Sequence, residues 1–310
     1  MGVLLLVGLL IGSSAGAKKR KPAGKPDLTV VSADLTSDPY LFGGEAEPGT
    51  VAFTDRTKNI GTAKAKRSET RLSLRLPGTR RGFNLTKRPV PALKRRESHG
   101  GSASDTWTMP ATSLGGYLAE ICANWNRRVV EKSLANNCLS VGDFGVIPRT
   151  VTGTVSGSGP YLGHSTVAET WQGTTTWVFD HFNDPVFVYR LERADVSFKD
   201  SGADGDCTYF GEGTATIVNG GADDALQITY GRFNHYLLNA DIPFTFLPVY
   251  TIHVICAHGG SHDASGPAQL LWLSTIGYKP ISPAHGWTSL ADTTTAPDGT
   301  VTWKWDMTPH

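Results

Sequence analysis

Hydrophobic and polar positions alternate along much of this chain with a period of two residues, the period of a half-buried β-strand. In residues 69–76, Leu72, Leu74 and Leu76 share one parity, while polar residues occupy the other. One face of the predicted strand therefore belongs to a core and the other to solvent. No stretch of helical length shows the 3.6-residue apolar period of an amphipathic helix. The pattern predicts an all-β protein.

Runs of this kind recur along the whole chain, separated by Gly, Pro, Asn and Asp residues that are typical of turns. In the first half they lie at 27–35, 50–61, 69–76, 83–90, 104–110, 116–124 and 138–146. In the second half they lie at 150–159, 174–182, 188–200, 207–218, 226–238, 250–258 and 300–307. The first series predicts an immunoglobulin-like β-sandwich, and the second predicts another antiparallel β-domain, either a sandwich or a barrel. Residues 174–180 and 301–306 are alike, which indicates paired strands or a degenerate repeat.

The first residues have the composition of an export signal. An apolar run from Val3 to Ile11 is followed by small residues ending at Ala17, after which we expect cleavage. The run is shorter than the roughly 20 residues that cross a bilayer, so no membrane span is predicted. Residues 18–25 are basic and contain Pro and Gly, as a solvated linker does. The predicted order is a signal peptide (1–17), a basic linker (18–25), a sandwich (26–147) and a second β-domain (150–310).

Charge divides the chain near the same boundary. Residues 151–310 hold six Lys and Arg against sixteen Asp and Glu, a net charge of −10. Residues 1–150 hold 23 against 12, a net charge of +11, although the formal total is only +1. Such a division lets the basic half meet an anionic surface, but it does not name a partner.

The four cysteines form an even set, two in each half, in a chain predicted to leave the cytoplasm. We therefore expect pairing within each half, Cys122 with Cys138 and Cys207 with Cys256. Neither pair has the CxxC spacing of a redox or zinc motif. The sequence predicts structural disulfides.

Four stretches of the first half, taken together, resemble one domain family. They are PDLTVVSADL (26–35), VAFTDRTKNIGTAKAKRSETRLSL (51–74), LTKRPVPALKRRESHGGS (85–102) and GGYLAEICANWNRRVVEKSLANNC (115–138). The region resembles the cell-adhesion-related domain found in bacteria, CARDB, with KNIGTAKA (58–65) in the place of the family's K-N-x-G-x-A. The family's acidic stretch before the final Asn-Asn is reduced here to VVEKSLANNC (129–138). The resemblance implies an immunoglobulin-like sandwich on an exported or surface protein, an adhesion module or spacer without catalytic residues.

Basic residues gather in the middle of this predicted sandwich. They are Lys64, Lys66, Arg67, Arg71, Arg75, Arg80, Arg81, Lys87, Arg88, Lys94, Arg95 and Arg96. Only Phe83 lies between them, so the stacking platforms of a single-stranded nucleic-acid site are missing and no nucleic-acid partner is predicted. Two interpretations remain, a solvated face or a contact with an anionic envelope polymer.

Four tryptophans of the second half are the candidate ligand-binding residues. Trp303 and Trp305 share one face of a predicted strand, and Trp171 and Trp177 share parity in the similar segment. An exposed face of indoles would stack on sugar rings and bind carbohydrate. A buried face would belong to the core, which is the more common place for large aromatic residues.

A second constellation contains His253, Cys256, His258, His262 and Asp263. These residue types ligate transition metals, but their spacing matches no zinc-enzyme signature. Strand parity also sends His253 and Cys256 to opposite faces. A His-rich polar turn is expected, with no metal and no cofactor. Asp204 and Asp206 are interpreted as an Asp-Gly turn, since the loop lacks an EF-hand pattern.

Catalytic signatures are missing from the sequence as well. No nucleophile elbow occurs, and a glycosidase pair chosen among Asp180, Asp184, Asp195 and Asp200 would be arbitrary. We therefore predict an exported or cell-surface bacterial binding or adhesion protein that is not an enzyme. A secreted hydrolase with its site in the second half and a structural stalk are the alternatives.

Overall fold

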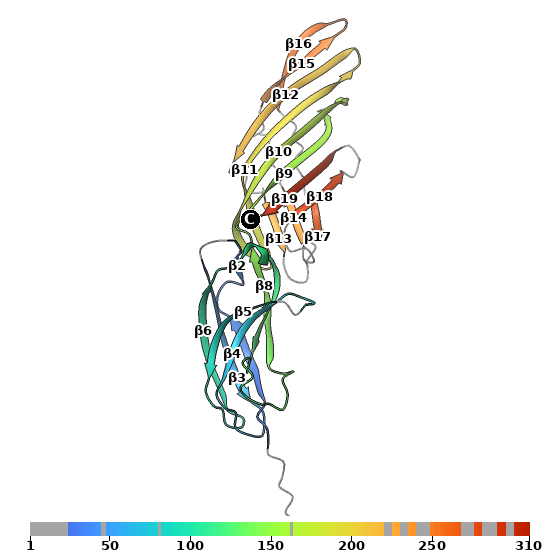
Figure 1. The fold of residues 1–310 in the computed structure, drawn as a ribbon. Helices are drawn as coiled ribbons and strands as arrows, with labels where there is room; N and C mark the ends of the chain where they lie inside the picture. Colours follow the sequence, from blue (N-terminus) through green and yellow to red (C-terminus); the bar gives the residue numbers. More distant parts are fainter. Residues whose placement is uncertain are drawn as a thin grey trace, which may run out of the picture.

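The computed structural model describes residues 24–44, 48–79, 82–161, 164–219, 225–229, 235–239, 249–267, 276–280, 290–295 and 301–310. The predicted signal peptide and residues 18–23 of the predicted linker lie outside these ranges. The described chain is built from strands and one short 3₁₀ helix, η1 (Ala111–Ser113), which confirms the predicted all-β class. Figure 1 shows an elongated molecule with one set of sheets above the other.

The first set is a two-layer β-sandwich. One layer has the strand order β1 (Leu28–Leu35), β3 (Gly49–Asn59), β6 (Ser98–Trp107). The other has the order β2 (Tyr40–Phe42), β8 (Cys138–Ile147), β7 (Gly115–Cys122), β4 (Ser68–Arg75), β5 (Gly82–Val90). All pairs are antiparallel except β2 with β8. Inward residues such as Phe53, Leu72 and Ile121 are fully buried between the layers.

Asn59 explains why the KNIGTAKA segment has its sequence. Its buried side chain bonds five backbone groups from three segments, the carbonyls of Ala63, Leu93 and Lys94 and the amides of Asp27 and Gly61. A side chain at Gly61 would collide with the backbone of residues 25–27. The segment therefore ties the chain entrance to the loops 60–67 and 91–97 at one end of the sandwich.

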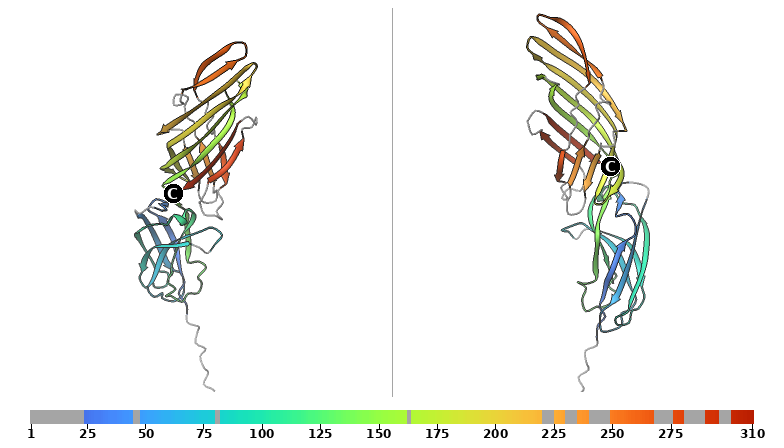
Figure 2. Two further views of the ribbon diagram at one scale, coloured as in Figure 1. Left: turned by 45° about the horizontal axis from the view of Figure 1, so that its top comes forward. Right: turned by 180° about the vertical axis from the view of Figure 1, so that it is seen from behind.

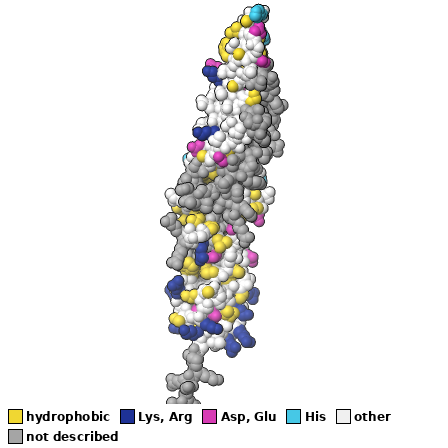
Figure 3. Space-filling model, turned by 90° about the vertical axis from the view of Figure 1, so that its right-hand side faces the viewer, with side chains coloured by type: hydrophobic (Ala, Val, Ile, Leu, Met, Phe, Trp, Pro, Cys, Tyr) yellow, Lys and Arg dark blue, Asp and Glu magenta, His cyan; other side chains and the backbone are white. Residues whose placement is uncertain are grey.

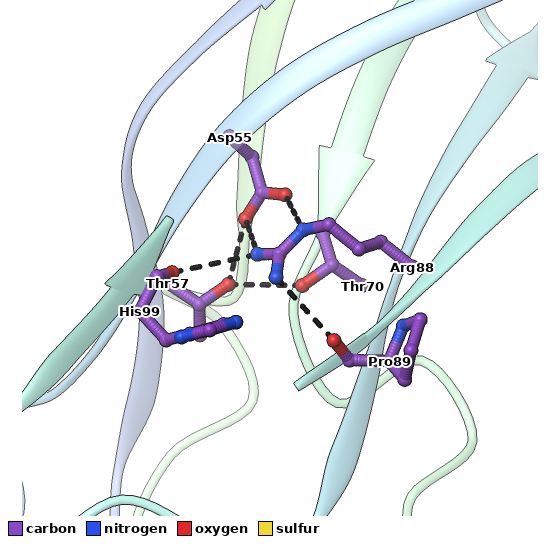
Figure 4. A network of polar contacts seen from close by, with 6 residues as sticks. All are labelled: Asp55, Thr57, Thr70, Arg88, Pro89 and His99. Atoms are coloured by element: carbon purple, nitrogen blue, oxygen red, sulfur yellow. Dashed lines mark hydrogen bonds and ion pairs between the residues drawn. The ribbon is translucent and has the colours of Figure 1, made fainter. Parts of the chain in front are cut away.

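A buried ion pair joins the two layers (Figure 4). The guanidinium of Arg88 on β5 contacts the Asp55 carboxylate of β3 with Nε–Oδ1 at 2.6 Å and Nη2–Oδ2 at 2.8 Å. Asp55 also accepts a hydrogen bond from Thr57, whose hydroxyl lies 2.9 Å from that of Thr70. The expectation that Arg88 lies on a solvated basic face is therefore wrong. Its charge is compensated in the core by an acid from the opposite layer.

The second set is one 11-stranded antiparallel sheet. Its main path is β16 (Gly260–Pro267), β15 (Val249–Cys256), β12 (Cys207–Val218), β11 (Val186–Asp204), β10 (His164–Asn183), β9 (Thr150–Tyr161), β19 (Thr302–Pro309), β18 (Leu290–Thr295). Residues 186–190 at the start of β11 pair with β13 (Ala225–Thr229). β13 in turn pairs with β14 (His235–Asn239), and β14 pairs with β17 (Ile276–Pro280).

The two similar segments of the sequence are not paired strands. Residues 174–180 belong to β10 and residues 302–306 to β19, and β9 lies between them with hydrogen bonds to both. The alternation in β19 separates buried Trp303, Trp305 and Met307 from the polar residues between them. The large aromatic residues therefore define the inner face of the sheet.

An aromatic cluster joins the sandwich to the large sheet. Rings of Tyr40 and Phe42 contact rings of Phe179, Phe182 and Phe187 at centroid distances of 5.2–5.7 Å. The chain crosses this junction through Pro148 and Arg149, and the Tyr189 hydroxyl donates to the Pro148 carbonyl at 2.8 Å. The Arg149 guanidinium lies over the Phe42 ring. Figure 2 shows the C-terminus at the same junction, where the amide of His310 donates to the Thr150 carbonyl.

Candidate functional site

The four candidate tryptophans are core residues, so their assignment to a carbohydrate-stacking surface is wrong. Trp171, Trp177, Trp303 and Trp305 are at most 7% exposed. The parity inferred from the sequence holds, because all four lie on the inner face of the sheet. That face packs into the core and does not present indole rings to a ligand. The opposite face of the same strands is the one that meets solvent.

Trp177 has a polar partner within this core. Its indole nitrogen donates to the hydroxyl of buried Thr175 at 3.0 Å. We expect Thr175→Val to lower the free energy of unfolding by about 1–2 kcal/mol, because it leaves a buried donor unsatisfied. Thr175→Ser keeps the acceptor and should lose less. Urea unfolding of both variants checks this, and equal losses would contradict it.

The outer face of the C-terminal sheet presents three consecutive rows of polar side chains across β19, β9, β10, β11 and β12. The middle row is Lys304, Ser156, Gln172, Ser197 and Thr214. The row on one side is Asp306, Thr154, Thr174, Asp195 and Thr216, and the row on the other is Thr302, Ser158, Thr170, Lys199 and Glu212. We call these fifteen residues the hydroxyl face. Residues directly opposite one another in register share a face, so the rows follow from the strand pairing.

Two adjoining hollows lie in the hydroxyl face. One of about 620 Å³ is lined by the middle row and by the row that contains Asp195. The other, of about 640 Å³, is lined by four residues of the middle row and by Thr170, Lys199 and Glu212. Ser156, Gln172, Ser197 and Thr214 line both. The hollows therefore form one shallow groove that runs across the strands.

The charges of the hydroxyl face balance. The face carries three acidic residues, Asp195, Glu212 and Asp306, and two basic ones, Lys199 and Lys304. Arg193, which is paired with Asp195, supplies the third positive charge. The Arg193 guanidinium bonds both oxygens of Asp195 and, with the Thr216 hydroxyl, lowers the pKa of that carboxyl, which therefore stays ionised. The groove offers fixed donors and acceptors without a net field of one sign.

A pair of carboxylates that sequence reasoning did not identify as a pair lies on the inner face of the sheet. Glu169 of β10 is directly opposite Asp200 of β11, and their side chains are 2% and 0% exposed. Burial raises the pKa of Asp200 to about 7. The alternation of residues along each strand could have indicated that both side chains point inward. That they are cross-strand neighbours depends on the register between two long strands, which the sequence does not display.

The histidine constellation lies at the far tip of the sheet, where Figure 3 shows imidazole and carboxylate side chains together. His253 Nδ1 is 2.6 Å from Asp263 Oδ1, and His258 Nδ1 is 3.2 Å from Asp206 Oδ2. His253 also lies against the half-exposed Phe210 ring. The arrangement is a polar hairpin of separate His–Asp pairs.

Cys256 belongs to a disulfide rather than to a ligand set. The structure joins Cys207 to Cys256 across β12 and β15, and Cys122 to Cys138 across β7 and β8. These are the pairs expected from the sequence. Asp206 lies close to the first pair, but the two sulfurs are used by their mutual bond. Both disulfides are compatible with an extracellular protein.

Comparison with known proteins adds a likeness for part of the chain. No protein-family model matches the chain, and no curated protein matches it. Among solved structures, the chain is similar to a crystal structure of the CARDB domain of the PF1109 protein from Pyrococcus furiosus in complex with di-metal ions. That match has 19% identity and a TM-score of 0.27, and covers 40% of this chain and 90% of the other. A solution NMR structure of the same domain matches with 20% identity and a TM-score of 0.25, over 39% and 95% of the two chains.

Both matched structures are CARDB domains. This is the family that the motifs of the first half resemble. Within the CARDB-like sandwich, the clustered basic residues do not form a single face. Arg88 is in the core, while Arg71 and Arg75 pair with Glu69 and Glu120. Arg80 and Arg81 lie outside the described residues.

Proposed function

We propose that this is an exported or cell-surface binding protein, without catalytic activity, that holds an extended neutral polysaccharide along the hydroxyl face. The three polar rows across five strands are the observation that carries the proposal. Hydroxyl, amide and charged side chains at fixed positions recognise sugar hydroxyls through hydrogen bonds, which are strong where one partner is charged.

The spacing of the rows supports a linear ligand. Neighbouring strands lie about 4.8 Å apart, which is close to the length of one sugar ring in an extended chain. A polysaccharide lying across the strands therefore meets a new set of side chains at each sugar. The twist of the sheet limits this match to a few consecutive strands. Five strands contribute to the groove.

Balanced charge favours a neutral polymer over an anionic one at this face. An anionic chain would meet Asp195, Glu212 and Asp306 in the groove as well as the basic side chains, and like charges brought together are unfavourable. Neutral hydroxyls can donate to these carboxylates and accept from Lys199 and Lys304. The CARDB-like sandwich then serves as the adhesion or spacer module below the binding sheet.

The test uses the full chain and a panel of neutral linear polysaccharides, with anionic polymers for comparison. We expect saturable binding to a neutral member. The double variant Gln172→Ala, Thr214→Ala should weaken it about tenfold or more, because it removes groups that line both hollows at about 1 kcal/mol or more each. Thr208→Ala, Ser261→Ala changes exposed hydroxyls of the same sheet outside the groove and should bind as the wild type does.

The outcomes separate the competing functions. Absence of binding to every neutral polymer would remove the polysaccharide proposal and leave the stalk. Equal loss of affinity in both double variants would place the ligand elsewhere. Release of reducing ends from a bound polymer would favour the hydrolase.

A further inference from the structure

The end of the sandwich where the chain enters carries a dense positive charge. Hydrogen bonds from residues 25–29 reach loop 60–67 on one side and loop 124–137 on the other, and Asn59 adds loop 91–97. We call this end the entry pole. Its exposed basic residues are Lys64, Lys66, Arg67, Lys94, Arg95, Arg96, Arg127, Arg128 and Lys132, with Lys25 beside them. Figure 3 shows Lys and Arg gathered over this lower end.

Apolar side chains project from the same surface. Val130 is 77% exposed, Leu134 52%, Ile60 49% and Trp125 36%. They are four of the eight exposed large hydrophobic residues in the part of the chain that the structure describes. Their concentration at one end, among basic residues, distinguishes the entry pole from the neutral hydroxyl face.

The loop that presents Val130 and Leu134 is held in a fixed conformation. The Cys122–Cys138 disulfide closes it. Buried Asn124 binds both the carbonyl and the amide of Val129, at 2.8 Å and 3.1 Å. The amide of Lys132 donates to the Pro26 carbonyl at 3.0 Å. The apolar side chains are therefore exposed by a constrained loop, and their ordering requires little additional entropy on binding.

We propose that the entry pole docks on the surface of an anionic lipid bilayer. Basic residues are attracted to anionic headgroups, and apolar tips with a tryptophan enter the interfacial region beneath them. A soluble anionic polymer would use the charge but would leave Val130 and Leu134 in water, so the bilayer accounts for more of the surface.

Docking is tested by co-sedimentation of the full chain with vesicles of phosphatidylcholine, with or without phosphatidylglycerol. We expect binding only to the mixed vesicles, with an affinity that decreases as salt is raised. Arg127→Gln, Arg128→Gln, Lys132→Gln should weaken binding on the order of a hundredfold. Val130→Ser, Leu134→Ser should weaken it on the order of tenfold while retaining all the charge.

A matched control distinguishes the entry pole from general surface hydrophobicity. Val218→Ser, Ile255→Ser removes apolar groups that are 60% and 50% exposed from the C-terminal sheet and should leave vesicle binding unchanged. Failure of the wild type to bind mixed vesicles, or equal binding by Val130→Ser, Leu134→Ser, would overturn the proposal. Binding to dextran sulfate that is insensitive to the latter pair, without vesicle binding, would assign the pole to an anionic polymer. These outcomes are independent of the polysaccharide test, because the two surfaces share no residue.

Discussion

Asp55→Ala is expected to lower the free energy of unfolding by about 3–5 kcal/mol, because it leaves a guanidinium buried without its counter-charge. The Arg88 side chain is only 6% exposed and that of Asp55 is fully buried. The remaining contacts of Arg88 are carbonyls of Pro89 and His99 at 3.4 Å, too long to replace a bidentate carboxylate. Denaturant unfolding at neutral pH measures the loss.

The double variant Asp55→Leu, Arg88→Met is the control for this prediction. It replaces both charges by apolar groups, a change that is often close to neutral in other proteins. We expect it to recover most of the stability lost in Asp55→Ala. If the double variant were as unstable as the single one, the loss would arise from packing or from the Thr57 bond rather than from an unpaired charge.

Asp200→Asn is expected to stabilise the protein by up to about 4 kcal/mol at pH 8. The pKa of Asp200 is raised to about 7 in the folded protein, against 3.8 for an ordinary aspartate, because burial disfavours the carboxylate. At pH 8 the wild type must therefore fold with an ionised group in the core. Asparagine has nearly the same shape and remains neutral.

The same shift sets the direction of the pH dependence. Between pH 4 and 7 the unfolded chain releases the Asp200 proton while the folded protein retains it, so stability declines as pH rises through this interval and then levels off. Asp200→Asn should remove this component of the decline. Unfolding followed across pH 4–8 checks it, and parallel curves for wild type and variant would contradict it.

Asp195→Asn supplies the matched control on the same strand. Asp195 lies on the outer face, and its pKa is lowered by Arg193 and Thr216. Its ionised form is thus favoured by folding, and removing the charge should not raise stability at pH 8. Only the inward position gives a gain. The comparison separates burial from a general effect of one fewer negative charge on an acidic domain.

Alternation and turn residues predicted the fold class because they report local geometry. The leucine parity of 69–76 places Leu72 and Leu74 in the core as expected. Ser73, on the opposite parity, is also buried, and its hydroxyl donates to Asn84 Oδ1 on the neighbouring β5. β10 has 20 residues and β11 has 19, which exceeds the usual strand length. Thr, Ser and Gly residues within them resemble turn residues in the sequence, so the sequence does not show that each strand is continuous.

The site depends on relations that a single sequence does not display. Arg88 stands in a basic run, and its partner Asp55 lies 33 residues earlier on the other layer. The hydroxyl face requires the register of five strands, while each strand alone shows only ordinary Thr and Ser alternation. The prediction that the tryptophans share one face of the sheet was right. Whether that face is buried or meets solvent depends on the rest of the sheet.

The aromatic junction has a consequence for cooperativity. Neighbouring domains usually move and unfold independently unless a substantial hydrophobic interface joins them. Here Tyr40 and Phe42 pack directly on Phe179 and Phe187, within one continuous hydrophobic cluster that extends into both sheets. Calorimetry should therefore record a single heat-absorption peak for the whole chain, so that damage at either end lowers the melting temperature of both.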